Sequence, residues 1–207
     1  MTEQKVDQVV FDIGGVLLDW SPHYLYEELI PDQEQREHFL TKIATPVWNQ
    51  QQDAGRPWAD AVAELTSLHP EHAEWIEAYD TGWLKMAKGL FEDTAAVLTE
   101  LRELGVPTYA LTNFSEEKWA VAQETFPILA GFDGEVVSGT ERTVKPGEEI
   151  YRILLERYDL DPARSFYMDD NQYNVDAARA VGFEAELFVD GQTLRDQLRD
   201  RGINLRR

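Results

Sequence analysis

The sequence contains no cysteine among its 207 residues. A disulfide, a thiolate metal site and a cysteine nucleophile are therefore excluded, and the composition fits a reducing cytoplasm. No segment reaches the roughly 18 consecutive apolar residues that a membrane span needs, and the first 20 residues lack the apolar run of a secretory signal. The sequence leads us to expect a cytoplasmic protein that does not enter a membrane.

Basic residues are also scarce, with 19 Lys and Arg against 39 Asp and Glu and a formal net charge of -20. Such a charge repels a nucleic-acid backbone or an anionic membrane surface, so we expect neither as a partner. The same field opposes an anionic metabolite. A phosphate site in this chain would therefore need a bound cation together with local Lys or Arg side chains.

The chain is globular in composition, with 43% hydrophobic residues and 6 Trp. Short β-branched or aromatic runs alternate with helical patterns, and this alternation indicates an α/β fold with a parallel sheet. Helices are expected over 94–104, 148–158 and 174–181, since glycines follow the first and last of them and Pro-Gly precedes the second. Strands are expected over residues 6–11, 108–111, 135–137, 165–168 and 186–189.

One interval, 21–88, shows helical pattern without a convincing strand. We interpret it as a helical insertion after the first strand, which divides the chain into a core, 1–20 and 89–207, and the insertion itself. Four tryptophans lie in it, and large aromatics of this kind usually form an interior. The alternative is that one or two of them line a substrate pocket. The four are Trp48, Trp58, Trp75 and Trp83.

Polar residues follow the predicted strands at the points where the strands end. Asp12 comes directly after an apolar strand and before two glycines, and Thr112 and Asn113 follow the strand at 108–111. Open α/β sheets bind ligands at the carboxyl ends of their strands. At that edge a hydroxyl and an amide can form hydrogen bonds with phosphate oxygens.

Two further polar groups occur later in the chain. Lys145, before Pro146, opens a predicted helix, so a cation and an anion-favouring helix N-terminus are expected at one place. Asp169 and Asp170 end the strand at 165–168, and two adjacent carboxylates repel each other unless a cation lies near them. Together these residues indicate a site for a divalent cation and an anion.

The segments FDIGGVLLD, LTNFS, VKP and MDDNQYN resemble the four ordered motifs of the haloacid dehalogenase (HAD) superfamily. The position of the helical insertion resembles the C1-capped branch. GRPW and MDDNQYNVDAARAVG are similar to small sugar-phosphate phosphatases and to the N-terminal phosphatase domain of soluble epoxide hydrolase. The resemblance covers nearly the whole chain. It implies a Rossmann-like core, a parallel sheet flanked by helices, and a small all-helical C1 cap.

The resemblance also implies a function, a Mg²⁺-dependent phosphatase acting on a phosphate monoester of a small metabolite, of which a sugar phosphate is one candidate. Asp12 would attack phosphorus and form an aspartyl-phosphate, which divides one difficult displacement into two easier ones. Thr112, Asn113 and Lys145 would hold the phosphoryl oxygens.

The cofactor implied is Mg²⁺, bound by the Asp12 carboxylate, the main-chain carbonyl of Gly14 and Asp170. Asp169 is expected to contact the lysine or a metal-bound water. Asn174 would support the same loop. For Asn174 a plain helix N-cap is an equally good interpretation.

Gly14 departs from the family pattern, because most HAD phosphatases carry a second Asp at this position as general acid and base. Such a group contributes about 10²- to 10⁴-fold. Three functions stay open: a phosphatase that obtains the proton from a water or a cap residue, a non-catalytic phosphate-binding or regulatory protein, and a 2-haloacid dehalogenase. Dehalogenases of this superfamily also lack that Asp, but the adjacent Asp169 and Asp170 argue against this activity.

Three residues of the insertion are candidates for contact with substrate. His23 lies where the chain leaves the core, and it could act as a substitute acid. Asp53 and Arg56 belong to the polar break QQDAGR between two helices, where they could form hydrogen bonds with sugar hydroxyls. An ordinary solvated loop is the alternative for this break.

Overall fold

A five-stranded parallel sheet forms the centre of the computed structural model, which describes residues 6–206. Strand β1 (Gln8–Phe11) lies in the middle of the order β5-β4-β1-β6-β7. Its neighbours are β4 (Thr108–Thr112) and β6 (Ser165–Asp169), and the outer strands are β5 (Gly134–Val137) and β7 (Glu184–Leu187). The positions 1–5 and 207 assigned to the core lie outside the described residues.

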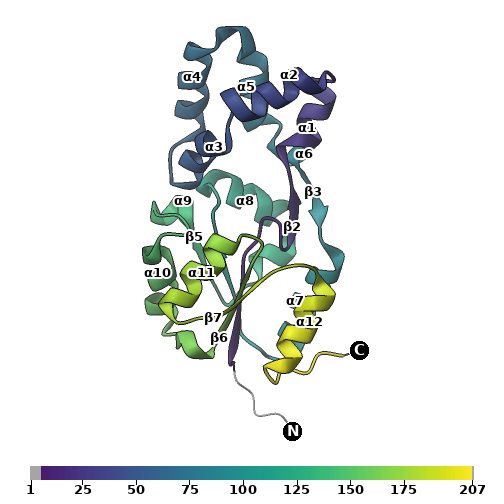
Figure 1. The fold of residues 1–207 in the computed structure, drawn as a ribbon, viewed down its shortest axis with the longest axis vertical. Helices are drawn as coiled ribbons and strands as arrows, with labels where there is room; N and C mark the ends of the chain where they lie inside the picture. Colours follow the sequence, from purple (N-terminus) through teal and green to yellow (C-terminus); the bar gives the residue numbers. More distant parts are fainter. Residues whose placement is uncertain (1–5, 207) are drawn as a thin grey trace.

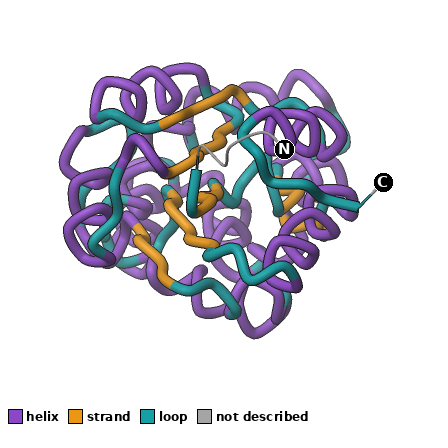
Figure 2. Tube along the Cα trace, turned by 90° about the horizontal axis from the view of Figure 1, so that it is seen from below, coloured by secondary structure: helices purple, strands orange, loops and turns teal. Residues whose placement is uncertain are grey.

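Both faces of the sheet are covered by helices, as Figures 1 and 2 show. Side chains alternate between the faces of a strand. Val9 and Phe11 pack with apolar residues of α7 (Glu92–Glu103), α8 (Glu116–Thr125) and α12 (Gly191–Asp200), whereas Val10 packs with those of α10 (Glu148–Tyr158) and α11 (Gln172–Val181). Because both faces are buried, β1 is apolar in sequence rather than alternating.

The insertion is a helical lobe that lies beyond the carboxyl ends of the strands (Figure 1). Side-chain oxygens of Ser21, Asp32 and Thr45 cap three of its helices, as expected for these residue types. The lobe consists of α1 (Pro22–Leu29), α2 (Gln33–His38), the π-helix η1 (Phe39–Ile43), α3 (Pro46–Asp53), α4 (Trp58–Leu68), the 3₁₀ turn η2 (Pro70–His72), α5 (Ala73–Thr81) and α6 (Trp83–Met86). Short elements of the core are η3 (Pro127–Ala130), α9 (Ser138–Glu141) and η4 (Pro162–Arg164).

An antiparallel ribbon, β2 (Leu18–Trp20) and β3 (Ala87–Leu90), connects the lobe to the core. The expectation of no strand within 21–88 was wrong at the end of that interval, because β3 begins at Ala87. The sequence of β3, AKGL, has no strand periodicity. It is extended because it pairs with β2, with Leu18 opposite Leu90 and Asp19 opposite Gly89. Tertiary context overrides local propensity in such a segment.

The α/β fold class with a parallel sheet and a helical insertion is confirmed. The last strand is displaced from its expected place: β7 begins at Glu184, and Val189 is exposed. The displacement arises at Gly182, which ends α11 in a left-handed conformation with φ 110°. The N–H of Phe183 then donates back to Ala178, a common way to end a helix, so the strand starts at once.

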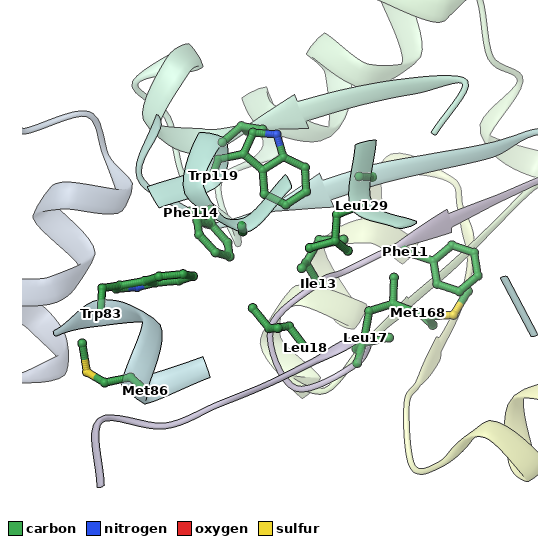
Figure 3. Close-up of a cluster of buried hydrophobic side chains, with 14 of the residues drawn as sticks. Phe11, Ile13, Leu17, Leu18, Trp83, Met86, Phe114, Trp119, Leu129 and Met168 are labelled. Carbon is green, nitrogen blue, oxygen red and sulfur yellow. The ribbon is translucent and has the colours of Figure 1, made fainter. Parts of the chain in front are cut away.

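Apolar side chains continue from the sheet into the lobe. Figure 3 shows Phe11 and Met168 of the sheet at one end of a cluster and Trp83 and Met86 of α6 at the other. Trp83 packs edge-on against Phe114 of the core, with ring centroids 5.5 Å apart. This shared interior attaches the lobe to the core.

Trp58 gives a second attachment. It is buried at 1% exposure, its indole N–H donates to Ser115 Oγ at 2.9 Å, and its main-chain N–H donates to Glu117 at 3.0 Å. Both acceptors are at the start of α8 in the core. Within the lobe its ring stacks on Tyr79 at 5.7 Å. Trp58 therefore connects the interior of the lobe with the sheet domain.

The substitution Trp58→Phe should lower the free energy of unfolding by about 1–3 kcal/mol, because it removes a buried hydrogen bond and part of a large apolar surface. Trp75→Phe is the matched control, since Trp75 is partly buried and stacks on His72 within the lobe. Urea denaturation monitored by circular dichroism would give both values. Equal losses for the two variants would contradict the connecting role of Trp58.

Candidate active site

Asp12 is fixed at the carboxyl edge of the sheet. Its main-chain N–H donates to Met168 on the neighbouring strand at 3.1 Å, which extends the parallel ladder by one residue. The residue is 7% exposed. Its Oδ1 accepts from the Ile13 N–H at 2.7 Å and lies 2.8 Å from Lys145 Nζ. Among the described residues, the hydrogen bond and the ion pair of this carboxylate both involve Oδ1, so Oδ2 is the oxygen left to react.

Lys145 is buried among oxygen atoms. Its Nζ lies 2.7 Å from Asp169 Oδ2 and 2.8 Å from Asp12 Oδ1, and it donates to the Leu111 carbonyl at 3.0 Å. The Tyr167 hydroxyl is 3.2 Å away and itself donates to Asp169. An ammonium group has three N–H donors, and here the two carboxylates and the carbonyl can accept all three. The lysine therefore has one fixed position between β1, β4 and β6.

Asp169 is held on both oxygens. Asn174 Nδ2 lies 3.0 and 3.1 Å from its Oδ1 and Oδ2, and the Asn171 N–H donates to Oδ1 at 2.8 Å. The N-cap of α11 is Asn171 rather than Asn174, so the alternative of Asn174 as a plain N-cap was wrong. Asn174 lies inside the first turn and orients Asp169, and through it Lys145.

Thr112 and Asn113 differ in what they can do. Thr112 is 1% exposed, and its Oγ1 has no hydrogen-bond partner among the described residues. A buried hydroxyl without a partner is uncommon and indicates a missing ligand or water. The Asn113 amide is engaged twice with Lys145, donating to its carbonyl at 3.0 Å and accepting from its N–H at 2.8 Å. Its side chain therefore positions the lysine loop rather than pointing free toward a phosphate.

The sequence predicted that Lys145 opens a helix, and this prediction was wrong. Helix α10 begins at Glu148, with Gly147 as its N-cap, and Glu148 and Glu149 occupy its first turn. These acidic side chains are exposed and complement the helix dipole themselves. The positive charge at the site thus comes from the Lys145 side chain, which turns back to the strand ends, and not from a helix terminus.

Three carboxylates gather beside this lysine. One oxygen from each of Asp12, Asp169 and Asp170 lies within 4.8 Å of the others. Gly15, with φ 72°, allows the approach of Asp170, because a Cβ at that position would lie 2.2 Å from Asp170 Oδ2. Gly14 is different: its φ is not positive, and a Cβ there would meet nothing within 4 Å. Only the second glycine is therefore required by the geometry.

The electrostatics of the cluster show a shortage of positive charge. Burial raises the pKa of Asp12 well above its ordinary value, and the Asp169 carboxylate adds to this, although Lys145 opposes it. Burial and Asp169 likewise raise the pKa of Asp170. For Asp169, burial acts upward, but the Lys145 ammonium together with the hydrogen bonds from Tyr167 and the Asn171 N–H outweighs it, and the pKa falls below the ordinary value. One ammonium thus balances one carboxylate well, and a divalent cation fits beside the other two.

A cavity of about 70 Å³ lies between the lobe and the core, next to Gly14. Its walls are largely aromatic, with polar groups from both sides. On the lobe side Asp53, at the end of α3, accepts from Asn49 Nδ2 at 3.1 Å. The lining residues are Gly14, Trp20, Asn49, Asp53, Trp58, Trp83, Asn113, Phe114, Ser115 and Lys118.

The three cap candidates occupy different places. Asp53 lines the cavity. His23 does not line it; its ring lies 3.7 Å from Glu37, with the side chain 42% exposed. Arg56 pairs with Glu64 and donates to Gln51 at 2.8 Å, which directs it along the surface of the lobe. Of these three, the structure brings only Asp53 to the cavity shared with Gly14.

Several residues of the site were missed by reasoning from the sequence. Tyr167, inside a predicted strand, contacts both Lys145 and Asp169. Ser115 and Lys118 line the cavity from α8. The serine had a signal, since it directly follows Thr112, Asn113 and Phe114 and caps α8. The lysine and the tyrosine had none, because their positions depend on how the lobe and the strands pack.

The parallel sheet, the carboxylates at its edge and the inserted helical lobe define a capped, Rossmann-like α/β fold. The family model for haloacid dehalogenase-like hydrolases matches residues 6–182, and the chain belongs to this family. None of the described helices is long and apolar enough to cross a membrane.

Individual relatives agree with this membership. The chain is 29% identical to a sesquiterpene phosphatase of Aspergillus oryzae over 84% of this chain and 85% of that protein. It is 25% identical to a pyrophosphatase of Bacillus velezensis, over 88% and 82%. A HAD family enzyme of Bacteroides thetaiotaomicron, solved with magnesium and inorganic phosphate, has a similar fold. Its TM-score is 0.70 at 21% identity, with 90% of this chain and 96% of that chain covered.

The substitution Lys145→Met should lower the free energy of unfolding by about 3–5 kcal/mol in metal-free buffer, because it leaves two buried carboxylates without their cation. Lys85→Met is the control, since Lys85 is exposed and its ion pair with Glu28 is at the surface. Chemical denaturation measures both. A loss below about 1 kcal/mol at Lys145, the size of a surface pair, would show that the cluster does not depend on this lysine.

The two neighbouring glycines give a second test. Gly15→Ala should weaken Mg²⁺ binding at least about tenfold, since a methyl group displaces Asp170 and a left-handed φ is costly for alanine. Gly14→Ala should leave the Mg²⁺ affinity within about twofold, because its Cβ enters open space and a main-chain ligand is kept. Isothermal titration with MgCl₂ compares them. The reverse order would place the cation elsewhere.

Proposed function

We propose that the protein is a Mg²⁺-dependent phosphatase that hydrolyses a phosphate monoester of a small metabolite through a phosphorylated Asp12. The observation that carries the proposal is the placement of Asp12, with Oδ1 held by Lys145 at 2.8 Å and Asp170 close by. The unpartnered Oγ1 of Thr112 on the adjacent strand supports it, since a phosphoryl oxygen would satisfy this hydroxyl. The names of the relatives, a sesquiterpene phosphatase and a pyrophosphatase, support the same class.

A Mg²⁺ ion held by Asp12, Asp170 and the Gly14 carbonyl would neutralise charge on the phosphoryl group and keep Asp12 ionised. The remaining work belongs to the side chains. Asp12 Oδ2 forms a bond to phosphorus while the ester oxygen departs. Lys145 and Thr112 hold phosphoryl oxygens in place. Water then attacks the aspartyl-phosphate, which restores the carboxylate and releases phosphate.

The cavity favours a substrate with an apolar face. Three tryptophan side chains and Phe114 contribute to its walls, and aromatic rings bind ring faces and hydrocarbon groups rather than compact polar groups. A sugar phosphate satisfies this through its ring face, and an aryl or terpenoid phosphate satisfies it more fully. The phosphate end would lie at Asp12, and the organic group would lie against the lobe.

A phosphate-release panel with aryl, terpenyl and sugar phosphates, run with Mg²⁺ and with excess chelator, tests the function. We expect release that needs Mg²⁺ and that falls at least about 10³-fold in Asp12→Asn, since the amide cannot act as the nucleophile. The variant should keep its melting temperature, because the two side chains are nearly the same size.

The alternatives predict other results in the same assay. Halide release from 2-haloacids that does not respond to chelator would assign the protein to the dehalogenases of its family. Silence across the panel, with phosphate bound in the presence of Mg²⁺, would indicate a non-catalytic binding protein. Activity retained in Asp12→Asn would exclude the covalent mechanism.

A further inference from the structure

The site lacks a group for proton transfer near the leaving oxygen. Gly14 has no side chain, and the space where its Cβ would be is open. Among the described residues, the Asp12 and Asp169 carboxylates are engaged with Lys145, and Asp170 is beside them in the acidic cluster. A phosphatase built on this site, as proposed above, needs a donor on another wall of the cavity.

Asp53 faces the cavity from the opposite side. It ends helix α3 of the lobe, and of the described residues that line the cavity it is the one with a carboxylate. Its side chain accepts from Asn49 Nδ2 at 3.1 Å and from the Ser115 N–H, a residue of the core. Ser138 donates to its main-chain carbonyl, again from the core. These contacts fix Asp53 against the core rather than leaving it in solvent.

The charged and titratable groups around Asp53 leave its proton affinity high. Tyr79 faces it from α5, Lys118 from α8, and Arg142 lies near Gly55 at the end of α9. Lys118 is already paired with Asp80, donating to its carboxylate and to its carbonyl at 3.0 Å. Burial raises the pKa of Asp53 to about 7, and only the Ser115 N–H opposes this shift.

We propose that Asp53 of the lobe is the general acid and base of the reaction, in place of the carboxylate that is absent at Gly14. A group that changes its protonation near neutral pH suits this role, since it can give a proton in one step and take one in the next. The proton donor then comes from the lobe, whereas the nucleophile comes from the core.

Bonds and protons balance over the two steps. The bond from phosphorus to the ester oxygen breaks as Asp12 Oδ2 bonds to phosphorus, and the protonated Asp53 gives its proton to that oxygen, which leaves as an alcohol. In the second step a water oxygen attacks phosphorus and the bond to Asp12 breaks. The Asp53 carboxylate takes the proton from this water. Phosphate leaves, and both carboxyl groups return to their starting states.

The leaving group decides how much the acid matters. An alkyl oxygen departs poorly without a proton, whereas a nitrophenyl oxygen departs as a stable anion. Asp53→Asn should therefore lower kcat/KM, which reports the step that releases the leaving group, by about 10²- to 10⁴-fold for alkyl phosphates and by less than about tenfold for p-nitrophenyl phosphate. The matched control is Asp60→Asn on α4, an exposed aspartate of the same lobe, which should change neither rate.

The pH dependence gives a separate readout. With alkyl phosphates the wild type should lose kcat/KM as pH rises through about 7, because the acid form of Asp53 that the first step needs is depleted. Asp53→Asn should lack this fall. If Asp53→Asn lowers kcat/KM equally for both ester classes and keeps the fall above pH 7, the proposal is overturned, since Asp53 would then only support the fold. A fall lost in Lys118→Gln instead would assign the proton to that lysine.

Restoring a carboxyl to the core completes the test. Gly14→Asp placed on Asp53→Asn should recover alkyl phosphate turnover at least about tenfold, because the new side chain enters open space at a φ that aspartate tolerates. Failure to recover, with an unchanged melting temperature and a kcat/KM for p-nitrophenyl phosphate within about tenfold of the wild type, would count against the proposal. The proposed function fails separately, if the wild type with Mg²⁺ hydrolyses no ester of either class.

Discussion

The buried ion pairs of Lys145 are the interaction on which the site depends. Its ammonium contacts Asp12, which directly follows β1, Asp169 of β6 and the Leu111 carbonyl of β4. One side chain therefore connects three neighbouring strands at their carboxyl ends. A buried charge pair of this kind is costly to desolvate, and it persists only where hydrogen bonds satisfy the remaining atoms. Here Tyr167, Asn174 and the Asn171 N–H supply those bonds to Asp169. The polar network therefore holds Lys145 and Asp169 in fixed positions, whereas the stability of this part of the fold comes from the apolar sheet beneath it.

The same arrangement separates two kinds of carboxylate. Asp169 is balanced by the lysine and its pKa is lowered, whereas Asp12 and Asp170 have raised pKa values because burial is not fully offset. A cation beside Asp12 would favour its ionised form, and Gly15 makes room for Asp170 to share in holding one. An anionic phosphoryl group can approach these carboxylates favourably only when the cation is present. The net charge of the whole chain, -20, also repels an anionic ligand, so a bound cation would favour phosphate binding for this reason too.

Sequence patterns predicted the residues of this edge well because each one directly follows an apolar strand. Asp12, Thr112 and Asp169 are placed by strand ends, and strand ends meet at one edge of a parallel sheet. The pairing of β2 with β3 was missed because AKGL is extended only through its partner. Tyr167 and Lys118 were missed for a similar reason, since nothing local distinguishes a catalytic neighbour from a core or surface residue. For Asn113, the motif identified the residue but not its hydrogen bonds, which go to the Lys145 main chain.

The position of Asp53 has a consequence for how the reaction would be controlled. A carboxylate at Gly14 would stand beside the phosphoryl group whether the lobe is open or closed. A carboxylate on α3 stands there only when the lobe is docked, and the contacts that orient it, from Ser115 and Ser138, cross from the core to the lobe. Trp58 joins the same two parts through Ser115 and Glu117. Docking would thus complete the acid–base pair at the moment when water is excluded, so leaving-group protonation and closure become one event.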